Sequence, residues 1–180
     1  MEKREKHSKI ILIFFVLFLI FFLMQVIAPI MIPYGQIEDL SGYTIVTNNL
    51  DEINKIPAPW NVIYRIGDSM CHQKSDRSYF INGNQMPFCS RCTAIILGIT
   101  IGIGFMLFFK FELDDRFIFL MLIGFIPIGI DGIGQLFGFW ESTNQIRFLT
   151  GILVGIISGI SIGVIIDELT SIQLKKTKSS

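Results

Sequence analysis

Four long apolar windows constrain this chain more than any other feature of its sequence. They run from Ile10 to Ile32, from about Cys92 to Phe109, from Phe117 to about Phe139, and from Phe148 to Ile166. A bilayer core of roughly 30 Å is crossed by about 20 apolar helical residues, and each window is close to that length. Because lipid offers the backbone no hydrogen-bond partner, each window must be helical. The sequence therefore predicts an all-α integral membrane protein built as a bundle of four transmembrane helices.

The composition agrees with a lipid environment. Hydrophobic residues make up 51% of the chain, and 15 basic side chains balance 15 acidic ones. A chain without excess positive charge lacks the attraction that a nucleic-acid-binding surface requires. We therefore expect the lipid bilayer as a partner, and no nucleic acid.

The first window follows the basic stretch MEKREKHSK, as the apolar part of a signal peptide would. Its apolar run is longer than the usual h-region of about 7 to 15 residues, and no clear small-x-small cleavage site follows it. We therefore expect this segment to be retained as a membrane anchor.

The distribution of Lys and Arg predicts the orientation in the membrane. Basic residues precede the first span, occupy the loop between the second and third spans, and close the chain: Lys3, Arg4, Lys6, Lys9, Lys110, Arg116, Lys175, Lys176 and Lys178. With four spans, all three groups fall on one side, which the positive-inside rule assigns to the cytoplasm. We predict a multi-pass protein of the cell membrane with both termini cytoplasmic. Its segments are a basic N-terminus at 1–9, a first transmembrane helix at 10–32, an extracytoplasmic loop at 33–91, three transmembrane helices within 92–166 and a tail at 167–180.

The long outward-facing loop contains one segment with a helical pattern, from about Trp60 to Met70, after two prolines. Trp60, Ile63, Tyr64 and Gly67 share one face of this helix. The face suits a helix that lies at the membrane interface, or equally an amphipathic helix packed on the end of the bundle. Either arrangement brings the following residues close to the membrane surface.

The same loop holds all three cysteines of the chain, next to a histidine, in the stretch SMCHQKSDRSYFINGNQMPFCSRC. Cys89 and Cys92 form a C-x-x-C pair, and Cys71 with His72 lies upstream across a polar loop. Two thiolates at this spacing can bind one cation, and a Cys/His pair from elsewhere can complete a tetrahedral site. We predict Cys71, His72, Cys89 and Cys92 as metal ligands. Zinc is the first candidate because thiolate-rich tetrahedral sites suit it.

Other interpretations of the cysteine stretch stay open. Adjacent residues rarely both point at one metal, so His72 could instead support the ligands or act in catalysis, leaving an open coordination position. A closed site would be structural, whereas an open one could activate water. Alternatively, Cys89 and Cys92 form a disulfide or thiol-exchange pair, since a helix N-terminus and Arg91 both favour a thiolate. The three thiols could also be uncoordinated.

A second polar group lies in the last two windows and the turn between them. Asp131 falls roughly 20 Å into the third span, where an ionisable group must face protein or water. Gln135 follows one turn later on the same helix face. Across the turn come Glu141, Asn144 and Arg147, while Ser142 or Thr143 can cap the fourth helix.

Two interpretations of this polar group compete. It is either a structural lock that fixes how two helices pack, or a pocket, for which the nearby Gly132, Gly134 and Gly138 leave room. For a pocket, the substrate-binding candidates are Arg77, Arg91, Gln135, Asn144 and Arg147, and the acid or base candidates are Asp131, Glu141 and His72. The predicted topology places this group and the cysteines on the same side of the membrane.

Glycines recur every four residues in the second and fourth windows, at Gly98 and Gly102 and at Gly151, Gly155, Gly159 and Gly163. Small residues at this spacing let helices approach closely. We expect close packing within the bundle, with a homo-oligomer through the same faces as the alternative.

The motifs CHQ, RSYFINGNQMPFCSRC, DGIGQ and STNQIRFLTG, taken in this order, resemble a family of small archaeal and bacterial membrane proteins known as domain of unknown function 2085. The resemblance runs from about Tyr64 to Gly155. Its motif positions here are Cys71, His72, Gln73, Arg77, Phe80, Gly83, Pro87, Cys89, Arg91, Cys92, Asp131, Gly132, Gln135, Ser142, Asn144, Arg147 and Gly151. Thr93 and Ala94 stand where the family often has glycines. The resemblance implies a polytopic membrane protein and supplies no reaction.

Three functions fit the sequence. The first is a membrane protein with a zinc site next to the polar intramembrane group, in a structural or accessory role. The second is a membrane enzyme that acts on a lipid-linked or phosphorylated substrate. The third is a thiol-redox protein.

Overall fold

The computed structural model describes residues 2–111 and 113–178, so Met1, Glu112, Ser179 and Ser180 lie outside the described residues, as do the side chains of 1–8 and 173–180. Its elements are α1 (Glu2–Met31), α2 (Leu50–Asn54), α3 (Trp60–Met70), a 3-10 turn (Ser75–Arg77), β1 (Phe80–Ile81), β2 (Asn84–Gln85), α4 (Ser90–Phe108), α5 (Asp115–Leu136) and α6 (Asn144–Lys178). Among the described residues, four helical segments are long and apolar enough to span a membrane: Lys9–Met31, Ser90–Phe108, Asp115–Leu136 and Asn144–Ile172. The predicted fold class is confirmed.

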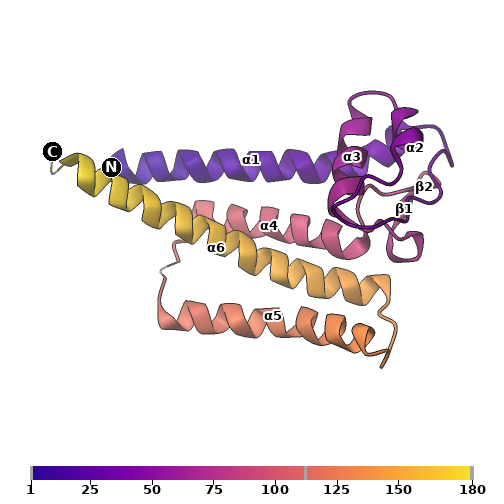
Figure 1. Cartoon of the computed structure of the whole chain (residues 1–180). Helices are drawn as coiled ribbons and strands as arrows, with labels where there is room; N and C mark the ends of the chain where they lie inside the picture. Colours follow the sequence, from indigo (N-terminus) through magenta and orange to yellow (C-terminus); the bar gives the residue numbers. More distant parts are fainter. Residues whose placement is uncertain (1, 112, 179–180) are drawn as a thin grey trace.

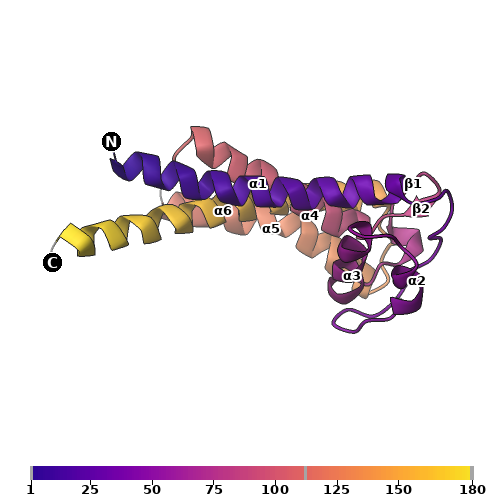
Figure 2. The same cartoon turned by 90° about the horizontal axis from the view of Figure 1, so that it is seen from above.

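The four long helices lie side by side, in the order α1, α4, α6, α5 (Figure 1). The segment between α1 and α4, residues 32–89, folds into a small head at one end of the bundle. Both chain ends lie at the other end, as Figure 2 also shows. Of the basic residues used to predict orientation, Lys3, Arg4, Lys6, Lys175, Lys176 and Lys178 have side chains outside the described part of the chain.

Glycines bring α4 and α6 together. A Cβ atom at Gly98 would lie 2.4 Å from the carbonyl oxygen of Ile152, and one at Gly155 would lie 2.3 Å from that of Ile95. Gly102 and Gly159 repeat this close approach one turn further along. These glycines therefore act inside one chain, in the way that small residues pack helices in membranes. A homo-oligomer through the same faces stays a prediction.

The head is held together by amide side chains more than by a sheet. Its only β-pairing among the described residues joins β1 to β2 through Asn82 and Gly83, both with positive φ, as a tight hairpin turn requires. Asn84 Oδ1 accepts from the backbone N–H of Ile37 at 2.9 Å, and Gln85 Oε1 accepts from Leu40 N–H at 2.9 Å. Both amides are fully buried. These two amide side chains satisfy backbone N–H groups that neighbouring strands would satisfy in a larger sheet.

The apolar face of α3 is covered by protein. Ile63, Tyr64 and Gly67 are buried, and the Tyr64 hydroxyl donates to the backbone oxygen of Gln85 at 2.8 Å. The helix contacts α1, and the residues that it leaves exposed include Val62 and Met70. This is the packing expected of an amphipathic helix on the end of the bundle, and a location of α3 at the membrane interface stays a prediction.

Candidate metal centre and adjoining polar network

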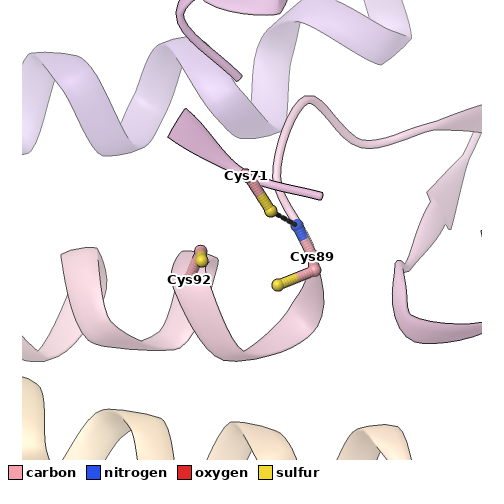
Figure 3. Close-up of side chains that lie close together, drawn as sticks. All are labelled: Cys71, Cys89 and Cys92. Atoms are coloured by element: carbon pink, nitrogen blue, oxygen red, sulfur yellow. Dashed lines mark hydrogen bonds between the residues drawn. The ribbon is translucent and has the colours of Figure 1, made fainter. Parts of the chain in front are cut away.

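Three thiols meet where the head joins α4 (Figure 3). The Sγ atoms of Cys71, Cys89 and Cys92 all lie within 4.8 Å of one another. Cys71 and Cys89 are each 2% exposed, and Cys92 is half-buried. In a tetrahedral site with Zn–S bonds of about 2.3 Å, sulfur atoms are about 3.8 Å apart. Small side-chain movements would bring the three thiols to that spacing, so the donor set fits a thiolate-binding metal.

The local backbone explains why these thiols converge. Cys71 ends α3, and its N–H donates to Gly67 O at 2.8 Å. A Cβ atom at Gly67 would lie 2.0 Å from the carbonyl oxygen of Pro87, so only glycine allows α3 to approach the segment before α4 this closely. Cys89 is the N-cap of α4, and Cys92 lies in its first turn. The C-x-x-C pair therefore projects from a helix N-terminus toward the end of α3.

Gln73 fixes the segment that follows Cys71. It is fully buried, has a φ of 41°, and its side-chain N–H donates to Pro87 O at 2.7 Å. A positive φ is unusual for glutamine, and its cost is offset by this bond and by the bond that Gln73 O accepts from Gln85. The segment after Cys71 and the segment before Cys89 are therefore held together by the hydrogen bonds of Gln73, without any contribution from the thiols.

The thiols share their protons unequally. Hydrogen bonds from the Cys89 and Cys92 thiols lower the pKa of Cys71 far below the ordinary value for a thiol. The backbone N–H of Cys89 also donates to Cys71 Sγ, at 3.4 Å. The Cys89 thiol donates a hydrogen bond to Cys71, and this bond raises the pKa of Cys89. A bound divalent cation would replace the thiol protons and allow all three sulfur atoms to be thiolates.

His72 is not brought into the thiol cluster. Its Nδ1 accepts a hydrogen bond from the backbone N–H of Lys74 at 3.1 Å, and its side chain is half-buried. Burial is the main cause that lowers its pKa. Among the side chains that the structure describes, those of residues 9–111 and 113–172, no His, Asp or Glu joins the three cysteines to form a larger cluster of that kind. The cluster therefore offers three ligands, and His72, the predicted fourth ligand, lies apart from it.

A hydrogen-bonded polar network begins immediately beside the thiols. Arg91, between the two cysteines of the C-x-x-C pair, forms an ion pair with Asp131 of α5 through its Nη2. Gln135 Nε2 donates to the same Asp131 carboxylate at 3.2 Å, and its Oε1 accepts from Arg147 Nη2 at 3.1 Å. Asp131 and Arg147 are only 4% and 6% exposed. The polar residues predicted from α4, α5 and α6 thus form one connected chain.

Asn144 joins this chain to the head. Its Oδ1 accepts from Arg147 Nη1 at 3.2 Å and from the Ser90 hydroxyl at 3.0 Å. Its Nδ2 donates to the backbone oxygens of Asp76 and Ser78, at 3.3 and 3.4 Å. One side chain at the start of α6 therefore contacts the head, α4 and its own helix.

The remaining predicted residues are placed as follows. Arg77 lies in the 3-10 turn, with its Nε 3.5 Å from an Asp76 carboxylate oxygen. Glu141 is exposed, and no hydrogen bond connects it to the network. Thr143 Oγ1 accepts from the backbone N–H of Ile146 at 3.4 Å and so caps α6, while Ser142 is buried beside it.

Ser90 was missed by sequence reasoning. It lies between Cys89 and Arg91, and its hydroxyl bonds Asn144, so it connects the thiol cluster with the network. Its position inside the CSRC motif was the available signal. Tyr79 was missed as well. Its hydroxyl donates to the backbone oxygen of Asn144 at 3.2 Å, a contact between residues 65 positions apart that no local pattern indicates.

Comparison with known proteins places this geometry in a family. A family model described as "Predicted membrane protein (DUF2085)" matches residues 71–165, which include the three cysteines and the whole network. An uncharacterized protein of Methanocaldococcus jannaschii, MJ1492, is 35% identical over 151 residues, which cover 82% of this chain and 86% of the relative. An uncharacterized protein of Methanothermobacter thermautotrophicus is 38% identical over 87 residues, 48% of this chain and 78% of its own. No solved structure matches the chain.

Proposed function

Because this chain belongs to the DUF2085 family of predicted membrane proteins, we propose that it is a multi-pass membrane protein whose cysteines bind one zinc ion at the outer face of the cell membrane. Cys71, Cys89 and Cys92 are its ligands, and the metal fastens the head to the first turn of α4. The role is structural or accessory to a partner.

One observation carries this proposal. Three thiols from two distant segments lie within 4.8 Å of one another, and two of them are almost fully buried. Thiolate-rich sites of this kind select zinc among the common divalent metals. A fourth ligand from solvent, or from His72 after a movement of its loop, would complete a tetrahedron.

The orientation is part of the proposal. We infer that the head, within the predicted loop at 33–91, faces outward, and that the predicted terminal segments at 1–9 and 167–180 are cytoplasmic. Termini on the same end of the bundle, opposite to the head, support this arrangement. The basic loop residues Lys110 and Arg116 also lie near the end opposite to the head, where the positive-inside rule requires them.

Metal analysis of the purified protein tests the proposal. We expect about one zinc ion per chain in the protein as isolated, because three convergent thiolates bind zinc tightly at neutral pH. Cys71→Ser and Cys89→Ser should each remove most of the metal. Met70→Ser, at the exposed neighbour of Cys71, is the matched control and should keep it. Absence of metal from the unmutated protein would refute the proposal, and loss of metal from His72→Ala would identify the fourth ligand.

A thiol-redox function is the second candidate, supported by the closeness of the same free thiols. It requires two of the cysteines to cycle between thiol and disulfide. Thiol trapping in cells under oxidising and reducing conditions distinguishes the two functions. A redox protein shows two interconverting forms, whereas cysteines occupied by zinc remain reduced in both conditions.

A membrane enzyme acting on a lipid-linked or phosphorylated substrate is the third candidate. Its support is the buried carboxylate of Asp131 among arginines, next to the thiol cluster. Asp131→Asn and Arg147→Ala should then each give cells the same phenotype as loss of the protein, while the variant protein still accumulates in the membrane. Unchanged phenotypes with normal protein levels would exclude catalysis through these residues.

A further inference from the structure

The Asn144 side chain joins three segments that each carry an arginine. Asn144 bonds the backbone on both sides of Arg77, the side chain of Arg147, and Ser90, which directly precedes Arg91. The charged groups that act electrostatically on Arg147 include both other arginines. The carboxylates of Asp76 and Asp131 act on Arg147 as well, so three positive and two negative charges from the head, α4, α5 and α6 lie near one another at the head end of the bundle.

The positive charge in this region is not balanced. Arg147 is 6% exposed, and its guanidinium donates to two neutral amide oxygens, those of Asn144 and Gln135. Among the residues described, no carboxylate lies within ion-pair distance of it. A buried cation is costly without a counter-charge. Asp131 is already paired with Arg91, and the Asp76 side chain is largely exposed.

Unused hydrogen-bonding atoms lie in the same region. The Nε atoms of Arg77 and Arg91 are buried without a hydrogen bond, although that of Arg77 lies 3.5 Å from an Asp76 carboxylate oxygen. The Oδ1 atom of Asp131 is also buried without a partner. A ligand that satisfies all three atoms must accept at least two hydrogen bonds and donate one. A singly protonated phosphate group has this combination of acceptors and one O–H donor.

The helix ends add to the attraction for an anion. α4 begins at Ser90 and α6 begins at Asn144, so two helix N-termini, with their partial positive charges, border the region. The guanidinium fork of arginine also matches phosphate oxygens in geometry. The side chains of Arg77 and Arg91 are 34% and 26% exposed, so both are partly open to solvent.

We propose that Arg77, Arg91 and Arg147 form a binding site for a phosphate-type oxyanion, supplied either by a lipid headgroup or by free phosphate. The Oδ1 atom of Asp131 accepts a hydrogen bond from the protonated oxygen of the ligand, and Asn144 positions Arg147. The site requires neither bound metal nor catalysis, and so it goes beyond the proposed zinc function.

Ligand binding to the purified protein in a maltoside detergent, which contains no phosphate, tests this site. The two probes are inorganic phosphate and the short-chain lipid dihexanoyl phosphatidylglycerol, each titrated at constant ionic strength and followed by the thermal unfolding midpoint. We expect saturable stabilisation by at least one probe. Arg77→Gln should weaken it about tenfold or more, as the loss of a charge-assisted hydrogen bond does.

Arg65→Gln is the matched control. Arg65 is an exposed head arginine that contacts Asn54, away from the network, and its loss should leave binding unchanged. Arg77→Gln is preferred to a change at Arg147 because a buried arginine could be required for folding. Binding of the lipid alone identifies a headgroup site, and binding of phosphate as well identifies a general oxyanion site. Absence of saturable binding, or equal binding by Arg77→Gln, overturns the proposal, and zinc content measured in the same samples keeps the two proposals separate.

Discussion

Asn144 uses nearly all of the hydrogen-bonding capacity of its side chain. Its amide oxygen accepts two bonds and its amide nitrogen donates two, to groups on α4, α6 and the head. Only asparagine and glutamine side chains offer two amide donors together with an amide oxygen that can accept two bonds. Glutamine is one carbon longer, so it would not place these groups at the same positions. A single residue therefore sets the positions of three separate segments.

Asn144→Ala should lower the free energy of unfolding by about 2 kcal/mol, because it leaves the partners of Asn144 unsatisfied in a partly buried site. Denaturant unfolding in detergent, followed by circular dichroism, measures the change. Gln145→Ala, at the exposed neighbouring position, is the control and should change stability by less than about 0.5 kcal/mol. Equal effects of the two substitutions would mean that Asn144 does not hold the network together.

The ion pair between Arg91 and Asp131 should show strong coupling. Removing one partner leaves the other charge buried and unpaired, whereas removing both leaves none. In a double-mutant cycle with Arg91→Gln and Asp131→Asn, we expect an interaction energy of about 1–3 kcal/mol. Unfolding of the two single variants and the double variant provides the numbers. Additive effects would show that the two residues do not interact in the membrane.

At the scale of elements, the contact between α4 and α6 should tolerate no added methyl group. Gly98→Ala would place a Cβ atom 2.4 Å from a backbone oxygen of α6. Since neither helix backbone can move cheaply, we expect a loss of about 1–3 kcal/mol in thermal or denaturant unfolding. Gly129→Ala is the control, because a Cβ atom there meets nothing within 4 Å. Its replacement should be neutral or stabilising by up to about 1 kcal/mol, and a similar loss at both sites would contradict the observed packing.

The helices could be predicted from the sequence because hydrocarbon leaves an apolar segment of this length few alternatives. The windows beginning at Ile10 and Cys92 overlap the apolar helical spans Lys9–Met31 and Ser90–Phe108, since the length and composition of a segment indicate a span. The architecture of the head could not be predicted in the same way. It depends on Asn84 and Gln85, whose side chains bond backbone groups more than 40 residues away. Nothing in a local pattern indicates such distant partners.

The candidate site was predictable to a similar, limited degree. A C-x-x-C pair at a helix start points both cysteines to one side, and the structure brings Cys71 to them. The side-chain direction of His72 was not predictable, because its ring accepts a hydrogen bond from the Lys74 N–H instead of joining the thiols. Likewise, Asp131 was recognisable as an intramembrane acid, but its pairing with Arg91 depends on how α4 and α5 both pack against α6.

At the scale of the whole molecule, the proposed orientation can be tested by cysteine labelling. Lys55→Cys introduces an exposed thiol in the head, and Arg116→Cys introduces one near the start of α5, at the opposite end of the bundle. In intact cells a membrane-impermeant maleimide should label the first and not the second, after subtraction of the unmutated background. Labelling of Arg116→Cys alone would invert the proposed topology.

The thiol cluster, the ion pair and the start of α6 together form a continuous junction between head and bundle. Cys89 and Cys92 hold α4 to the end of α3, while Arg91 and Ser90, between them, hold α4 to α5 and α6. A metal at the thiols would therefore stiffen the first turn of α4 and, through it, the positions of the arginines.

X-ray absorption spectroscopy at the zinc edge, on the purified protein without added metal, tests the central claim most directly. Three thiolates should appear as three sulfur neighbours at about 2.3 Å, together with one lighter atom at about 2.0–2.1 Å. Cys92→Ser should reduce the sulfur count to two. A spectrum with only oxygen and nitrogen neighbours, or a protein that carries no zinc, would contradict the account.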